Sequence, residues 1–350
     1  MNELYVEVNG SGPDLVLLHG WGLNLRVWDG LVEALRDRFR LIAVDLPGHG
    51  RSAWTFKQGT PAEQAWLIYT TLAPISDRYS LLGWSLGGQI ALDLAAAMPG
   101  QIDRLVLVAA TPRFAEASDW PYGMKTSVIT KLATQLREDY RQTVSDFLEL
   151  QVRGSVEGAN VLEQLRHALL IHGQAQPKAL EAGLNTLATS DLRPTLGHVR
   201  APALVVAGQR DRITAPAASK ALADALPDAV YVEMRRAAHA PFLSHRTEFA
   251  TLVGKFLLGR QLDTEADSSA VTGAEAVADE AAAKRVAQQR APVGDGGKPV
   301  LEARCGGGAA MGRSVDSGDD NAAKATQVRP VKLKRMKARA RKKLQQASMR

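Results

Sequence analysis

Residues 79–98, YSLLGWSLGGQIALDLAAAM, decide the fold. A short apolar run at 79–82 predicts a buried strand, and a helical pattern follows over 86–98. Between them, Gly83-Trp84-Ser85-Leu86-Gly87 matches G-x-S-x-G, in which a serine on a sharp strand-to-helix turn has strained backbone angles. Side chains two residues on either side would collide, so glycine is required there. The stretch predicts an exposed serine hydroxyl at a helix N-terminus.

The sequence on both sides of this stretch alternates between apolar runs and helical patterns. Continuous apolar runs of this kind are typical of parallel strands buried on both faces. The helical patterns fall near 27–38, 63–72, 217–225 and 248–258. The other strand runs are Leu15-Val-Leu-Leu, Leu41-Ile-Ala-Val, Leu105-Val-Leu-Val, Ala203-Leu-Val-Val and Val230-Tyr-Val. This alternation predicts an α/β fold with a mostly parallel, doubly wound sheet.

One segment interrupts the alternation. Residues 112–191 contain no convincing strand, only helical patterns such as 127–151 and 160–171. A helical insert after a strand would lie over the carboxyl edge of the sheet, where open α/β folds bind ligands. We therefore expect a core of residues 1–111 and 192–260 and a helical lid of residues 112–191.

A serine nucleophile needs a base that is itself oriented by a carboxylate. His239 follows the last predicted strand, in a loop of small residues that leaves an imidazole free over the sheet edge, and His245 is its rival. The order Ser, Asp, His along the chain is typical of α/β hydrolases, and Asp211 ends a strand between Ser85 and His239. We predict a Ser85, Asp211, His239 triad.

The remaining histidines and nearby acids receive structural roles. We expect the histidines in or beside the helical insert, at 167, 172 and 198, to face solvent or fill gaps in the core. His49 lies in a turn, and His19 is expected to be a buried brace for its loop. Asp224 and Asp228 fall in a helix and the turn after it, and we expect both to be solvated.

A second glycine-rich turn follows the first predicted strand. In His19-Gly20-Trp21-Gly22 the glycines let a backbone amide turn toward the site, so the Trp21 N–H is expected to pair with the Leu86 N–H around an oxyanion. The turn has neither G-x-G-x-x-G nor a Walker lysine, which argues against nucleotide binding. The chemistry requires no metal or organic cofactor.

The net charge of +6 is confined to the C-terminal region of this 350-residue chain. Residues 1–260 hold 26 Lys and Arg against 26 Asp and Glu, and residues 261–350 hold 17 against 11. The latter segment loses the apolar periodicity, so we expect a disordered basic tail. Its last part, 324–350, has eleven basic residues, no acidic one and no aromatic residue to stack on bases, so specific nucleic-acid recognition is not expected.

Composition also bears on the compartment. The lone Cys305 excludes an intrachain disulfide, and no run approaches the roughly 18 apolar residues of a spanning helix. The N-terminus lacks the basic and apolar zones of a signal peptide. We expect a cytoplasmic protein without a membrane span.

Several motifs together resemble the BioH family, the pimeloyl-[acyl-carrier-protein] methyl ester carboxylesterases of biotin synthesis. They are His19-Gly-Trp-Gly-Leu-Asn24, Asp45-Leu-Pro-Gly-His-Gly-Arg-Ser52, Gly83-Trp-Ser-Leu-Gly-Gly88, Asp119-Trp-Pro121 and Ala237-Ala-His-Ala-Pro-Phe-Leu-Ser-His245, and the match covers about residues 3–258. The resemblance implies an α/β-hydrolase fold and a monomeric enzyme that releases methanol from a carrier-protein ester. It implies Ser85, Asp211 and His239 as the triad, Trp21 and Leu86 as oxyanion donors, and Trp84 and Phe147 in substrate binding.

The lid departs from that family in its charges. Where the family has arginines that grip the acidic carrier protein, this chain has Gln142, Asp146 and Glu163. Arginines at 137, 141, 153 and 166 lie nearby, but residues 113–190 carry eight basic and nine acidic residues. We therefore hypothesise that the basic tail supplies the missing attraction.

Other functions keep some of these features. A dehalogenase or epoxide hydrolase would place an acid at position 85, whereas a broader short-chain esterase or a carbon–carbon bond hydrolase would keep the same triad. A binding module that had lost catalysis would be expected to break a triad position, and none is broken. A tether to nucleic acid or an anionic surface would rest on the tail alone.

Overall fold

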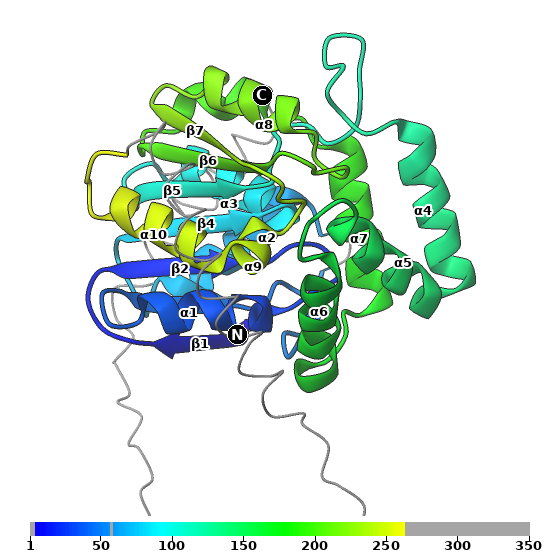
Figure 1. Ribbon diagram of the computed structural model, residues 1–350, viewed down its shortest axis with the longest axis horizontal. Helices are drawn as coiled ribbons and strands as arrows, with labels where there is room; N and C mark the ends of the chain where they lie inside the picture. The colour runs from blue at the N-terminus through cyan, green and yellow to red at the C-terminus, as the bar shows by residue number, and fades with distance from the viewer. Residues whose placement is uncertain (1–3, 57–58, 263–350) are drawn as a thin grey trace, which may run out of the picture. The chain divides into compact units, whose positions relative to one another are not determined.

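The six predicted strands and one further strand form a seven-stranded sheet in a computed structural model that describes residues 4–56 and 59–262 (Figure 1). The predicted tail lies outside the described residues except for its first two positions. The strands are β1 (Val6–Asn9), β2 (Asp14–Leu18), β3 (Arg40–Val44), β4 (Tyr79–Trp84), β5 (Ile102–Val108), β6 (Ala203–Gly208) and β7 (Ala229–Met234). Their spatial order is β1-β3-β2-β4-β5-β6-β7, and only β1 runs antiparallel to its neighbour. The doubly wound, mostly parallel sheet is confirmed.

The central strands are apolar because both faces are covered. β6 is buried over its whole length, and the last four residues of β2 and of β3 are buried. Parallel pairing sets Leu18 opposite Gly83, so β2 and β4 end at the same edge of the sheet. The sequence did not predict β1, because this edge strand is half exposed and has no continuous apolar run.

Helices pack against both faces of the sheet. α3 (Leu86–Ala97) contacts β4 and β5, and α8 (Pro216–Ala225) contacts β6 and β7. α2 (Pro61–Leu72) lies on α3, while α1 (Asp29–Leu35) pairs with α10 (Arg246–Leu257). In Figure 1, α1 and α10 lie in front of the sheet and α2 and α3 lie behind it.

The segment between β5 and β6 is helical, with α4 (Thr126–Glu138), α5 (Tyr140–Val152), α6 (Gly158–His172) and α7 (Pro177–Thr189). Figure 1 shows these helices grouped together beside the sheet. The helical pattern over 127–151 forms two helices, which meet at Asp139, whose side chain accepts a hydrogen bond from the Gln142 amide at 3.0 Å. Asp139 is thus an N-cap, a preferred role of aspartate, and α5 starts anew after it.

Short helices complete the fold. They are the 3₁₀ helices η1 (Leu25–Trp28) and η2 (Arg193–His198) and the single turn α9 (Pro241–Ser244). The two ends of the helical segment come together, since the Leu192 amide donates to the Pro112 carbonyl at 2.9 Å. Within residues 4–56 and 59–262, no helix is both long enough and apolar enough to cross a membrane.

Candidate active site

Ser85 occupies a strained turn between β4 and α3. Its backbone angles are φ 55° and ψ −117°, a conformation that costs a non-glycine residue on the order of 1–3 kcal/mol. A Cβ on Gly87 would lie 2.5 Å from the carbonyl oxygens of Leu18 and His19, and a Cβ on Gly83 would collide with the Gly87 carbonyl. The two glycines are therefore required by close backbone packing, for the steric reason that the motif predicts.

Asp211 and His239 come together although 28 residues separate them. Asp211 follows β6, and His239 lies in the loop after β7. The distance from His239 Nδ1 to Asp211 Oδ2 is 2.7 Å, and both side chains are almost fully buried. Asp211 Oδ1 accepts hydrogen bonds from the amides of Ile213 and Thr214, at 2.8 and 3.0 Å. Because an ionised carboxylate only accepts hydrogen bonds, Nδ1 carries the proton and Nε2 keeps a free lone pair.

Trp84 connects the serine turn to the histidine loop. Its indole Nε1 donates to the His239 carbonyl at 2.8 Å, and its ring centroid lies 5.6 Å from the imidazole. The ring also packs against Phe242 at 4.9 Å, and Trp84 is only 1% exposed. These contacts indicate that Trp84 holds the His239 loop. Its predicted place beside an acyl chain stays a prediction.

The helical segment contacts the loops that carry His239 and Asp211. The His239 amide donates to the Gln151 carbonyl of α5 at 3.1 Å, and Arg210, next to Asp211, donates to the Gly154 carbonyl at 2.9 Å. Neither Gln151 nor Gly154 is predicted from the sequence. Both contacts use backbone oxygens, so no residue type could signal them.

Trp21 lies in the loop between β2 and η1, residues 19–24, which we call the Trp21 loop. At Trp21 this loop meets the helical segment. Its indole Nε1 donates to the Leu180 carbonyl of α7 at 2.9 Å, and its ring meets Phe147 of α5 edge-on at 4.8 Å. A Cβ on Gly183 would lie 2.6 Å from Trp21 Cδ1 and 3.3 Å from Leu86 Cδ2. Gly183 thus lets α7 approach the two residues predicted to donate to an oxyanion. A glycine in the middle of a helix is the sequence signal for such an approach.

Two buried histidines hold the loop that carries Trp21. His19 Nε2 accepts from the Leu46 amide at 2.9 Å, and His49 Nε2 accepts from the Gly22 amide at 3.3 Å. Burial lowers the pKa of His49 to about 4 and holds the pKa of His19 well below its usual range. Both rings are therefore neutral at pH 7, and the prediction that His19 braces its loop is confirmed.

The structure separates the other histidines and acids from this pair. His167 and His198 are exposed, as are Asp224 and Asp228. His245 directly precedes α10 and contacts Ser244, with 2.8 Å between Nδ1 and Oγ. His172 is buried, in agreement with the second of its two expected roles, and it lies 2.7 Å from Asp45, a contact that was not predicted.

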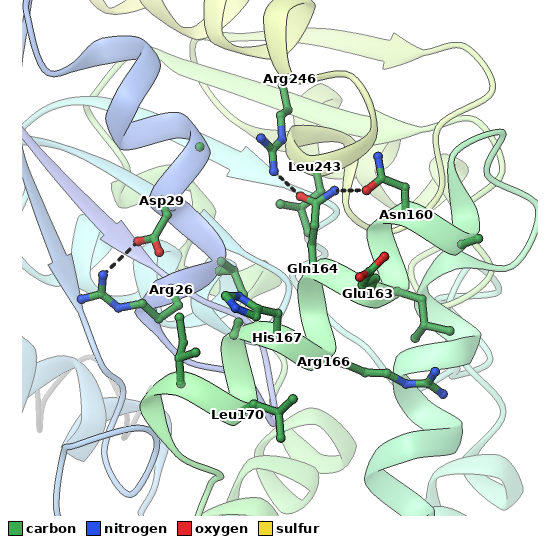
Figure 2. Close-up of a pocket in the computed structure, with 16 residues that line it drawn as sticks. Arg26, Asp29, Asn160, Glu163, Gln164, Arg166, His167, Leu170, Leu243 and Arg246 are labelled. Atoms are coloured by element: carbon green, nitrogen blue, oxygen red, sulfur yellow. Dashed lines mark hydrogen bonds and ion pairs between the residues drawn. The ribbon is translucent and has the colours of Figure 1, made fainter. Parts of the chain in front are cut away.

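An open groove of about 890 Å³ lies along α6, with further lining from α1, α9 and α10 (Figure 2). Its arginines are partnered: Arg26 pairs with Asp29, Arg166 with Glu149, and Arg246 with Gln164. Of the lid arginines singled out in the sequence, Arg137 also pairs with an acid, Glu181. The groove and the helical segment therefore do not form a broadly positive surface.

Comparison with known proteins adds independent information. Residues 13–246 match the family model described as alpha/beta hydrolase fold. Curated pimeloyl-[acyl-carrier protein] methyl ester esterases from Nitrosomonas europaea and Nitrosospira multiformis are 44% and 36% identical, over 72% and 73% of this chain and 98% of each relative. A solved esterase from Exiguobacterium antarcticum superposes with a TM-score of 0.66 at 22% identity, covering 73% of this chain and 95% of that one.

Proposed function

Because the chain belongs to the α/β-hydrolase family, we propose that it is a serine carboxylesterase that hydrolyses the methyl ester of pimeloyl-acyl carrier protein. The substrate is supported by the curated relatives, which carry this name and align over nearly their whole length. The chemistry is supported above all by one observation, the buried 2.7 Å contact between His239 and Asp211. We further propose a cytoplasmic monomer whose macromolecular partner is the carrier protein.

The proposed reaction is two-step acyl transfer. His239 Nε2 takes the proton of Ser85 Oγ as that oxygen attacks the ester carbonyl. His239 then gives the proton to the departing methoxide, so methanol leaves and the acyl group stays on Ser85. Water, deprotonated by the same imidazole, attacks the acyl-enzyme; the bond between the acyl carbon and Ser85 Oγ breaks, the acid leaves, and His239 returns the proton to Oγ. Asp211 keeps the imidazole oriented and stabilises its positive charge in both steps.

The oxyanion of each tetrahedral intermediate is proposed to lie between the amides of Trp21 and Leu86. Leu86 is the first residue of α3, and the first amides of a helix have no partner within the helix. The Trp21 loop is close, since a Cβ on Gly20 would lie 3.4 Å from Ser85 Cβ. Each such donor is worth on the order of 3 kcal/mol of transition-state stabilisation.

The proposal assigns the acyl chain to the space between the sheet edge and the helical segment, which would act as a lid. Phe147 is half-buried against Trp21 and would contact the chain there. Trp84 would contribute from beneath the acyl chain, beside its contacts with the His239 loop.

Ser85→Ala tests the nucleophile. We expect the variant to lose about 10⁶-fold in kcat on a short-chain nitrophenyl ester, as loss of a serine nucleophile does. Ser118→Ala, at an exposed serine of the same chain, is the control and is expected to match the wild type. Comparable rates for the two variants would refute the assignment.

The substrate needs its own measurement. Methanol release from pimeloyl-acyl carrier protein methyl ester is expected to show a far higher kcat/KM than hydrolysis of the nitrophenyl ester. Equal values would favour a broader short-chain esterase, and rescue of a biotin auxotroph that lacks this esterase would test the role in the cell.

A further inference from the structure

A second buried aspartate–histidine pair lies outside the triad. His172 Nε2, at the end of α6, is 2.7 Å from Asp45 Oδ2, in the loop after β3. Their side chains are 2% and 0% exposed. Nothing in the esterase reaction uses this pair, yet it joins the helical segment to the core across 127 positions of the chain.

Asp45 is also bonded to the loop that carries Trp21. Its Oδ1 accepts from the Leu25 amide at 2.8 Å, where that loop ends, and its Oδ2 also accepts from the Arg51 amide at 2.9 Å. The carboxylate accepts a third hydrogen bond from the His172 Nε2–H, in addition to those from the Leu25 and Arg51 amides. One buried carboxylate therefore fixes the Trp21 loop and the end of α6 at the same time.

The chain on either side of His172 makes further contacts with the same loops. Asn24 donates to the carbonyls of Ala168 and Gly173, each at 3.0 Å. The Gln176 amide donates to the Gly48 carbonyl at 2.7 Å. The Leu180 carbonyl accepts from the Trp21 indole at 2.9 Å. Residues 168–180 thus follow the Trp21 loop and support it from outside.

We propose that His172 is a positioning residue for the esterase reaction: by binding Asp45 it holds residues 168–180 against the Trp21 loop and so keeps the Trp21 amide directed at the oxyanion. This inference rests on the proposed function. The Trp21 loop lies outside the sheet, so β-sheet hydrogen bonding does not hold it in place. Within it, Gly22 has a φ of 76°. An oxyanion donor works only when it is pre-oriented, and a displacement of about 1 Å is enough to weaken catalysis.

Two substitutions separate the hydrogen bond from the volume of the side chain. His172→Gln keeps an N–H donor near the position of Nε2, whereas His172→Phe keeps a ring of similar size without a donor. His167→Phe, at an exposed histidine of the same helix, is the matched control. Each variant is assayed on a nitrophenyl ester, with active-site titration to count folded enzyme.

We expect His172→Phe to lower kcat by about 10- to 100-fold per titrated site with KM changed less than about twofold, because the lost contribution acts on the transition state. His172→Gln is expected to recover most of kcat, and His167→Phe to match the wild type. Wild-type kcat in His172→Phe, or equal losses in the glutamine and phenylalanine variants, would overturn the proposal.

Trp21→Phe is a second test of the same contacts, because it removes the indole N–H that donates to the Leu180 carbonyl. Its loss in kcat and that of His172→Phe are expected to be less than additive in the double variant, since both loosen one loop. Strict additivity would overturn the proposal.

If His172→Phe does not fold, unchanged kcat in Trp21→Phe overturns the proposal. The nitrophenyl assay does not depend on the carrier-protein substrate, so failure of the substrate proposal would be seen separately.

Discussion

At the residue scale, exchanging one oxygen of Asp211 for an NH₂ group should impair catalysis and leave stability almost unchanged. In Asp211→Asn, one oxygen can still accept from the amides of Ile213 and Thr214, but the NH₂ group then faces His239. The imidazole must turn its proton to Nε2, and the base is lost. We expect kcat to fall about 10⁴-fold, the effect known for this substitution in serine proteases, with little change in the melting temperature.

Asp224→Asn is the control for that prediction. Asp224 is exposed on α8, where it pairs with Lys220, and we expect wild-type kcat. The measurement is kcat on the nitrophenyl ester together with thermal unfolding of each variant. A fall of less than about tenfold for Asp211→Asn would contradict its role in holding the tautomer.

Single residues were predictable from sequence where a motif restricts the backbone. Ser85 follows from its glycines, and Asp211 and His239 follow from their order along the chain and their positions after strands. His172 was not predictable in this way, since its importance comes from a contact with Asp45 that no local pattern encodes. The available signal was Asp45 itself, in the Asp-Leu-Pro-Gly-His-Gly run, which the serine chemistry leaves unexplained.

At the element scale, a cluster of charges closes the base of the helical segment. Asp191, just before η2, binds Arg193 at 2.6 Å and Arg113 at 2.9 Å, and Arg193 also reaches Asp119 at 3.0 Å. The hydrogen bond from Arg193 lowers the pKa of Asp191 to about 2. The cluster joins the two ends of the segment that the sequence predicts to be a lid.

This pKa gives a pH dependence with a definite sign. The folded pKa of Asp191 lies below its ordinary value of 3.8, so its stabilising contribution is fully present above that value and is lost as the pH falls toward 2. We expect Asp191→Asn to unfold at lower urea concentration than the wild type at pH 7 and pH 5, and the difference to shrink below pH 4. A difference that stays constant down to pH 3 would contradict the assignment.

Elements were predicted well where burial is complete and poorly where it is partial. The central strands are continuous apolar runs, but β1 is a half-exposed edge strand of four residues. The helix break at Asp139 was missed because the helical pattern continues through it, and only the capping bond to Gln142 shows where α5 begins. Partial burial and local side-chain bonds weaken the periodicity on which such predictions depend.

At the scale of the whole molecule, the curated relatives and this chain differ in length. The match covers 98% of the relative from Nitrosomonas europaea but only 72% of this chain, so part of this chain has no counterpart in that relative. Residues 261–350 hold the entire excess of positive charge. Residues 113–190 carry eight basic against nine acidic residues, and Arg137 and Arg166 are already paired.

We therefore predict that the tail attracts the acidic carrier protein. Replacing the eleven basic residues of 324–350 by glutamine in the full-length chain should raise KM for the carrier-protein ester severalfold at low salt and leave KM for the nitrophenyl ester unchanged. The effect should shrink as salt rises, because attraction between exposed charges is screened beyond about 10 Å at 0.1 M salt. Removal of residues 263–350 should act in the same direction. An unchanged KM for the carrier-protein ester at low salt would contradict the prediction, and Arg141 and Arg153 of the helical segment would then be the next to test.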